Sequence, residues 1–366
     1  MDGQVARPED AELSRLLERF VCVRVVQAWG LDLSLFQFDY GLTWAAFFMN
    51  ADRAIDGRYG SRFGEKTGRE TTIEGFKKAL EGALELHAGY PGNKALLAGK
   101  KGPEPAFPTP EAIPWLKGKP NVRPADGSRG TCIHCHQVQD GTLWSLREQG
   151  RVLPDNVVWP YPTPDQVGLS LDPRERALVT GVAAGSPAEK GGFRAGDRIV
   201  ALDGQPMLSI ADVQWVLHQA RDPVTLRADV DRAGSRATAS LALEAGWRRK
   251  GDFTWRVVTW SLRHRLLGME PLQPVSAEER RTLGLPADGL GLRVKGFPPD
   301  WVKEQNRAAR QKFRPGDVVI EVDGRRDFST EAALLGYLVQ KKPPGQAAHF
   351  TVLRDGRRER VTLTVP

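Results

Sequence analysis

The 366-residue sequence predicts an α+β protein built from several domains. A chain of this length is expected to hold two to four domains. An internal repeat supports this organisation, because residues 193–204 (FRAGDRIVALDG) are echoed by residues 313–324 (FRPGDVVIEVDG). Self-similarity at a fixed spacing is typical of tandem copies of one structural unit. The sequence therefore predicts two similar domains in tandem.

Each copy of the repeat has the same predicted order of elements. A Gly-Asp turn leads into an alternating, β-branched strand, and an Asp-Gly turn closes that strand. A helix is then expected in both copies. In the first copy Ser209 and Asp212 have the spacing of a capping box, and in the second copy Ser329 and Thr330 precede the apolar helix positions.

The first copy resembles a PDZ domain of the bacterial HtrA type. The resemblance rests on residues 184–189 (AGSPAE), 192–193 (GF) and 196–197 (GD). The second copy is less similar, since residues 298–301 (PPDW) replace the Ser-Pro-Ala turn. We assign one PDZ domain to residues 165–247, and a Trp-rich linker with a second PDZ domain to residues 248–366.

The PDZ resemblance implies where a peptide would bind. PDZ domains add an extended C-terminal peptide to a sheet edge, and a backbone loop captures its carboxylate. The resemblance places one carboxylate loop at Val167, Gly168 and Leu169, and a second at Leu267, Gly268 and Met269. Val213 and Leu217 would line the apolar side-chain pocket. The alternative is a PDZ-like fold that serves only as a docking or structural module.

Residues 1–92 form a third expected unit. A helix over 11–19, strands over 20–26 and 44–50, and a helix that begins with a capping box at Thr71 and Glu74 are predicted. This order resembles the later part of a thioredoxin fold, without its first strand and its active-site segment. We expect Cys22, inside an apolar β-branched run, to be an inert buried thiol.

The most specific motif is Cys132-Ile-His-Cys-His136, within a Pro-rich segment over residues 93–164. The C-x-x-C-H pattern is typical of covalent haem attachment. Cys132 and Cys135 would form the thioethers of haem c, and His136 would be an axial ligand of the iron. A sixth ligand would have to come from another segment, such as His87, His218 or His264; a five-coordinate haem is equally allowed.

Two other chemistries compete for this motif. A dithiol or disulfide of the redox C-x-x-C type needs no further ligand and stays open as the alternative. Zinc is not expected, because structural zinc sites usually draw four ligands from two separated pairs. Here three of the candidate ligands are consecutive, and there is no second cysteine pair.

The whole chain resembles a thioredoxin-like/PDZ-domain (seleno)protein family of environmental bacteria. The matching segments are residues 20–26, 35–40, 59–62, 132–136 and 211–218. Some members are expected to carry selenocysteine, whose codon is normally read as stop. We therefore expect Met1 to be an artefactual start, with the export signal and the thioredoxin-like active site upstream of it.

Composition narrows the function classes. The net charge of +7 comes from scattered Lys and Arg, so no nucleic-acid partner is expected. No apolar run approaches the ~20 residues of a transmembrane helix, and the N-terminus has no apolar core of a signal peptide. A G-x-S-G-G-like nucleophile turn is also absent, so proteolysis is not expected, and any enzymatic activity is left open.

The sequence thus predicts an exported, redox-associated binding protein, periplasmic if the native start lies upstream. Haem c would transfer electrons or sense a ligand, with a possible redox partner. The PDZ domains would dock protein C-termini or extended peptides. The alternative is a PDZ adaptor without haem, in which Cys132 and Cys135 act as a thiol–disulfide switch or oxidoreductase.

Overall fold

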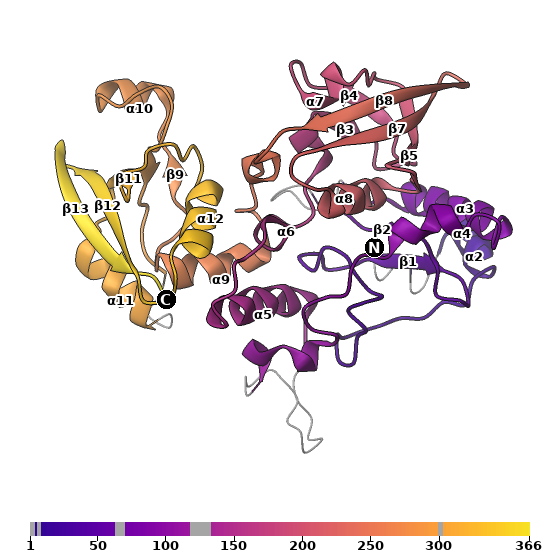
Figure 1. Ribbon diagram of the computed structural model, residues 1–366, viewed down its shortest axis with the longest axis horizontal. Helices are drawn as coiled ribbons and strands as arrows, with labels where there is room; N and C mark the ends of the chain where they lie inside the picture. The colour runs from indigo at the N-terminus through magenta and orange to yellow at the C-terminus, as the bar shows by residue number, and fades with distance from the viewer. Residues whose placement is uncertain (1–3, 6–8, 63–69, 118–132, 299–302) are drawn as a thin grey trace. The chain divides into compact units, whose positions relative to one another are not determined.

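The computed structural model describes residues 4–5, 9–62, 70–117, 133–298 and 303–366 (Figure 1). The chain divides into two compact units. The first contains Met1–Gln139 and Trp159–Gly251, and the second contains Asp140–Val158 and Asp252–Pro366. The four predicted domain ranges stay predictions. None of the described helices is long and apolar enough to cross a membrane.

The N-terminal part of the first unit is a small α+β layer. Its elements are α2 (Ala11–Leu17), an antiparallel hairpin of β1 (Ala46–Met49) and β2 (Ile55–Tyr59), α3 (Ile73–Ala88), α4 (Lys94–Leu97) and η1 (Ala98–Lys100). Asp10 begins α2 by accepting hydrogen bonds from two backbone amides of the first turn. The hairpin and α3 share an aromatic core of Phe48, Tyr59 and Phe76, to which Leu208 of the first repeat adds its side chain. The N-terminal layer and the first repeat therefore form one packed body.

The predictions for this layer have different outcomes. The strand over residues 44–50 is confirmed by β1. The predicted strand over residues 20–26 is wrong: this run is extended but pairs with no strand among the described residues, and its valines are exposed. Cys22 is consequently exposed, and its assignment as a buried thiol is wrong. Thr72, one residue after the predicted Thr71, caps α3.

The first repeat folds into two small sheets and two helices (Figure 1). After η4 (Pro164–Val167), β3 (Leu169–Leu171) pairs with β4 (Val179–Val182). A second, four-stranded sheet has the order β6 (Gln205–Pro206), β5 (Asp197–Leu202), β7 (Val224–Arg232) and β8 (Ser235–Leu243). The helices are α7 (Pro187–Lys190) and α8 (Ile210–Gln219), and η5 (Trp247–Lys250) follows β8. The alternating burial of β7 and β8 is that of sheets with one face in the core.

The second repeat forms one five-stranded antiparallel sheet. Its order is β13 (Arg357–Thr364), β12 (Ala347–Arg354), β11 (Val318–Val322), β10 (Leu292–Arg293) and β9 (Gln273–Pro274). The helices are α6 (Asp155–Val158), α9 (Val257–Leu266), α10 (Ala277–Thr282), α11 (Lys303–Lys312) and α12 (Glu331–Lys341). Helix α5 (Cys135–Glu148) begins in the first unit and continues in the second.

The repeat is visible in a matched pair of buried carboxylates. Asp197 accepts a two-pronged hydrogen bond from Arg232, with distances of 2.7 and 2.8 Å from Nε and Nη2 to the carboxylate oxygens. Asp317 accepts the same fork from Arg354, at 2.8 and 2.7 Å. Both aspartates follow the glycine of the Gly-Asp turn, so the repeated motif is a strand start fixed by an arginine from a neighbouring strand. The hydrogen bond from Arg232 holds the pKa of Asp197 below its ordinary value.

Removing the Asp197 carboxylate should destabilise the first unit. Asp197→Ala leaves Arg232 without its partner, and we expect the free energy of unfolding to fall by about 3 kcal/mol in urea titrations at pH 7. The matched control is Asp229→Ala, whose ion pair with Arg227 is largely exposed and worth under about 1 kcal/mol. Because the folded pKa of Asp197 is lowered, its contribution should disappear as the pH falls below about 4. Equal effects of the two substitutions would contradict this role.

Candidate peptide-binding site

One edge of β3 faces away from its partner strand. The carbonyl of Gly168 and the amide of Asp172 both form hydrogen bonds on the β4 side. Residues in a strand alternate in direction, so the amides and carbonyls of Leu169 and Leu171 point to the opposite edge. This edge can accept one more antiparallel strand, which is the first requirement of a peptide-binding site.

The loop before β3 has a shape that only glycine adopts without strain. Gly168 has a φ of +89°, and a Cβ atom there would lie 2.1 Å from Ser186 Oγ. The flanking side chains of Val167 and Leu169 are buried in the core of the domain. The predicted carboxylate loop is therefore a tight turn whose backbone, not its side chains, is presented at the start of the strand edge.

Helix α8 supplies the second wall. Ile210, Gln214 and His218 are spaced by one helical turn and share one face. Ile210 lines a shallow recess with Pro173, which follows β3. The structure places the predicted pocket residues Val213 and Leu217 deeper, fully buried in the core cluster of the domain.

Tyr161 covers the far end of this α8 face. Its backbone amide donates to His218 Nδ1 at 3.2 Å, and its carbonyl accepts from Gln214 Nε2 at 3.4 Å. The rings of Tyr161 and His218 stack with centroids 4.0 Å apart. This contact could not be predicted from the sequence, because Tyr161 stands alone among prolines and its partner lies on a helix far along the chain.

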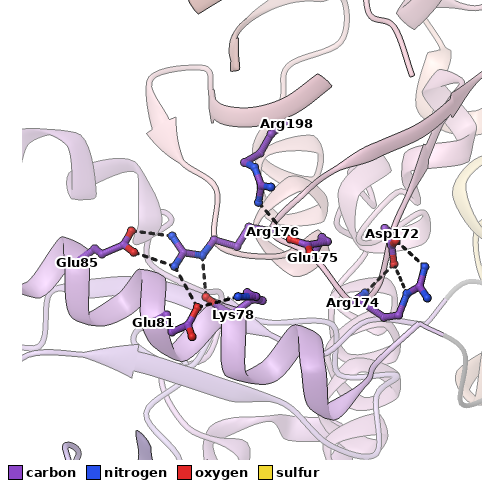
Figure 2. Close-up of polar contacts among 8 residues, drawn as sticks. All are labelled: Lys78, Glu81, Glu85, Asp172, Arg174, Glu175, Arg176 and Arg198. Atoms are coloured by element: carbon purple, nitrogen blue, oxygen red, sulfur yellow. Dashed lines mark hydrogen bonds and ion pairs between the residues drawn. The ribbon is translucent and has the colours of Figure 1, made fainter. Parts of the chain in front are cut away.

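The turn between β3 and β4 is tied to α3 (Figure 2). The Arg176 guanidinium binds Glu85 through two hydrogen bonds of 2.7 and 3.0 Å and donates from Nε to the carbonyl of Lys78. In the same turn, Glu175 accepts a hydrogen bond from Arg198. Since Glu85 is largely exposed, this ion pair orients the turn between β3 and β4 against α3 and adds little to stability.

Close backbone packing strengthens the same contact. The Thr72 hydroxyl donates to the carbonyl of Pro173 at 3.1 Å. A Cβ atom at Gly75 would lie 2.1 Å from that carbonyl oxygen, so only glycine lets α3 approach so closely. The end of β3 is therefore held against the N-terminal layer.

The outer face of α8 is held by buried charges. Lys100 Nζ lies 2.8 Å from Asp212 Oδ1, and both side chains are fully buried. The backbone amide of Arg58 also donates to Asp212, and its carbonyl accepts from Ser209 Oγ at 2.6 Å. The Arg58 guanidinium stacks on Trp215 at 3.8 Å. Ser209 is confirmed as the N-cap, but Asp212 binds Lys100 and does not close the predicted capping box.

The second predicted carboxylate loop directly follows α9. The side chains of Leu267 and Met269 are buried, and Gly268 has a φ of +65°. The strand that follows is the edge strand β9 of the five-stranded sheet. The positions of this loop and of the first one thus correspond, although their surroundings differ.

The C-x-x-C-H motif is described only from its second residue, and Cys132 lies outside the described residues. Cys135 and His136 are partly buried in the first turn of α5. Burial raises the pKa of the Cys135 thiol and lowers the pKa of His136, which favours the neutral imidazole. The His136 ring stacks on that of His134, with the ring centroids 5.5 Å apart.

An apolar cluster lies beside this motif. Ile133 and Val138, which flank Cys135 and His136, pack with residues from two earlier segments. The partly buried aromatic members are Trp29, Phe36, Tyr40, Phe107 and Trp115. These aromatic side chains are the surroundings that a haem ring would need, and the sequence did not connect them to the motif.

The three histidines considered as a sixth haem ligand differ in burial and in their contacts. His87 is exposed on α3, and His218 is engaged by Tyr161. His264 is buried on α9, packs edge-on against Trp260 at 4.1 Å, and belongs to the second unit. No three His, Cys, Asp or Glu side chains gather in a metal-binding group within the residues that the structure describes.

Comparison with known proteins identifies the two repeats. One family model described as a PDZ domain matches residues 178–228, and a second PDZ-domain model matches residues 279–365. Both matches fall on the strands and helices of the two repeats. The chain therefore contains two PDZ domains.

The chain also has distant similarity to HtrA-type proteins. It is 27% identical over 197 residues to a protein of Pseudomonas fulva named a probable periplasmic serine endoprotease, DegP-like; the match covers 53% of this chain and 39% of that protein. A like-named protein of Halomonas elongata is 36% identical over 94 residues, which cover 26% and 18% of the two chains. The matched region spans well under half the length of these relatives.

Solved structures give a weaker likeness. The HtrA-type protease AlgW with a decapeptide is 18% identical, with a TM-score of 0.23, over 38% of this chain and 48% of that one. The serine endoprotease from Yersinia pestis is also 18% identical, with a TM-score of 0.23, over 32% and 38% of the two chains.

The buried charges predict a specific pH dependence. Asp56 in β2 is almost fully buried, one of its oxygens has no hydrogen-bond partner, and burial raises its pKa from 3.8 to about 6. A raised folded pKa means that stability is lost as the pH rises from about 4 through about 6. Asp56→Asn should therefore raise the free energy of unfolding at pH 8 by up to about 3 kcal/mol, and change little at pH 3.5.

Urea titrations of wild type and variant at both pH values measure this difference. The control Asp165→Asn removes an exposed carboxylate of the same unit and should have no effect at either pH. A loss of stability at pH 8 in Asp56→Asn would show that the charged form is the one that the fold stabilises.

Proposed function

We propose that this chain is a peptide-docking protein and that its first PDZ domain captures C-terminal peptide segments. The observation that carries the proposal is the open edge of β3, which directly follows the tight turn at Gly168. A peptide would add to β3 as an antiparallel strand, with its carboxylate at the loop of Val167, Gly168 and Leu169. On the α8 side Tyr161 binds Gln214 and His218, so a peptide that reached these side chains would replace Tyr161.

The N-terminal layer has a supporting role in this proposal. The ion pair of Lys100 with Asp212 fixes α8, and the contacts of α3 with Pro173 and Arg176 fix the end of β3. Both walls of the site are thus held before any peptide arrives. A preorganised site loses less conformational entropy on binding, so affinity would rise without additional contacts.

Peptides with free and blocked ends test the site. Fluorescence anisotropy with labelled decapeptides should show binding of the free carboxylates and at least tenfold weaker binding of the C-terminal amides. Gly168→Ala should weaken binding at least tenfold, because its left-handed backbone and its contact with Ser186 exclude a Cβ atom. The matched control Gly181→Ala, which meets only ordinary contacts in β4, should bind like wild type. Equal binding of acids and amides would reject carboxylate capture.

We also propose a c-type haem at the C-x-x-C-H motif. The supporting observation is the placement of Cys135 and His136 between Ile133 and Val138, which belong to the apolar cluster with the five aromatic side chains. Cys132 and Cys135 would hold the thioethers and His136 the iron; when bound, haem supplies an iron that can change oxidation state or bind a small ligand. The thiol–disulfide switch is the weaker alternative, since reactive thiols have a lowered pKa and burial raises that of Cys135.

Two coarser expectations accompany this proposal. The relatives named periplasmic support an exported location, where c-type haem attachment takes place. The truncated thioredoxin-like domain over residues 1–92 stays a prediction. The described part of this region contains a two-stranded sheet, β1 and β2.

Covalent haem can be measured directly. Protein fused to an export signal and co-expressed with a cytochrome c maturation system should give a pyridine haemochrome and a haem-stained band after denaturing electrophoresis. Cys132→Ala/Cys135→Ala should abolish both signals, whereas Cys22→Ala should keep them, since Cys22 lies outside the motif. A colourless wild-type protein beside a matured control cytochrome would leave the peptide-docking function alone.

A further inference from the structure

The second PDZ domain has a loop whose amides are already used. The amide of Leu267 donates to the carbonyl of Arg263 at 2.8 Å, and the amide of Gly268 donates to the carbonyl of His264 at 3.0 Å. These bonds close the C-terminus of α9, where Gly268 has the left-handed conformation typical of a helix end. Two of the backbone donors expected to capture a peptide carboxylate therefore bind the preceding helix.

The adjacent strand edge is also occupied. The amide of Val275 donates to the carbonyl of Gly291, the residue before β10. Alternation therefore directs Leu272 and Pro274 to the opposite edge, which an added peptide would need. The amide of Leu272 donates to Glu331 Oε1 at 2.9 Å. Proline has no amide hydrogen, so Pro274 cannot donate to a peptide. The edge presents no free donor at either position.

Glu331 is itself fixed by an arginine of α9. Arg263 Nε and Nη2 donate to Glu331 Oε1 and Oε2 at 2.8 and 2.7 Å, and both side chains are about 5% exposed. Glu331 is the first residue of α12, the helix that corresponds to α8. One buried carboxylate thus connects α9, the strand edge and α12, and it accepts the hydrogen bond that a peptide carbonyl would otherwise accept.

The first PDZ domain differs from the second at the strand edge and not at the loop, because its Gly168 amide likewise donates to a backbone carbonyl, that of Asp165, at 2.9 Å. The first residue of its helix α8 is Ile210, which cannot accept a hydrogen bond from a strand edge. The β3 edge positions are Leu169 and Leu171, neither of which is proline. The two domains therefore share a fold and differ at the positions that decide whether a strand can be added.

We propose that Arg263 and Glu331 form an intramolecular latch that closes the second PDZ domain to peptides. The domain binds a peptide strand only after the Glu331 carboxylate leaves the Leu272 amide. In the resting chain, peptide capture is confined to the first PDZ domain. This inference rests on the proposed peptide-docking function and adds its regulation.

Site-resolved crosslinking tests the latch. The full chain is incubated with random-sequence decapeptides that have a free carboxyl and one photo-crosslinking side chain, and crosslinks are mapped by mass spectrometry. In wild type we expect crosslinks at residues 167–171 and 210–218, and background levels at 267–275 and 331–339. Arg263→Ala/Glu331→Ala should increase crosslinking at the second domain at least tenfold. The control Arg293→Ala/Glu279→Ala removes a more exposed ion pair of the same domain and should stay at the wild-type level.

The outcomes separate the latch from the docking function. Wild-type crosslinks at the second domain equal to those at the first, or no gain in a folded latch variant, would overturn the latch. A wild type without crosslinks at the first domain would reject the docking function, whereas a gain in the variant would still support the latch.

A measurement on the amide itself covers a variant that does not fold. By hydrogen exchange, the Leu272 amide should be protected in wild type. In a Glu331→Ala variant whose β12 and β13 amides stay protected, it should exchange at least tenfold faster. An unprotected Leu272 amide in wild type would overturn the latch.

Discussion

The first unit depends on one buried ion pair, that of Lys100 with Asp212. Asp212 also accepts hydrogen bonds from the backbone amides of Arg58 and Leu208, and Lys100 donates to the carbonyl of Pro206. Burial of an isolated charge costs several kcal/mol, so each partner is tolerated only because the others compensate it. Burial lowers the pKa of Lys100, whereas the nearby Asp212 carboxylate raises it. Together these contacts join β2, η1 and α8, and they make the N-terminal layer a structural part of the first PDZ domain.

Much of the fold could be predicted from the sequence, because the repeat encodes local rules. The Gly-Asp turn, the alternating strand and the helix cap use residues that are close in sequence, and β5, β11, α8 and α12 follow from them. The predicted strand over residues 20–26 failed for the opposite reason. A β-branched run favours a strand, but a strand forms only where a partner supplies the hydrogen bonds, and a single sequence does not reveal the partner. Exposure of Cys22 followed from the same missing partner.

The sites show the same division between local and distant information. The two loops of Val167–Leu169 and Leu267–Met269 were placed by resemblance and have corresponding positions. What each loop can bind was not predictable, because it depends on contacts that are distant in sequence. The contact of Tyr161 with α8 and the contact of Glu331 with the edge of β9 are two examples. Asp212 is a third: its spacing from Ser209 suggests a capping box, yet a buried lysine far upstream binds its carboxylate.

The difference between the two PDZ domains follows from the chemistry of one helix position. A carboxylate at the first residue of a helix is favoured by the helix dipole, so Glu331 is stable at the start of α12 before any partner is counted. Its two oxygens can then bind Arg263 and the Leu272 amide together, which a neutral side chain could not do. Ile210 at the same position of α8 adds only apolar surface. In the proposed latch, one acidic residue supported by one arginine thus occupies the donor of Leu272, and Pro274 supplies no second donor at the same edge.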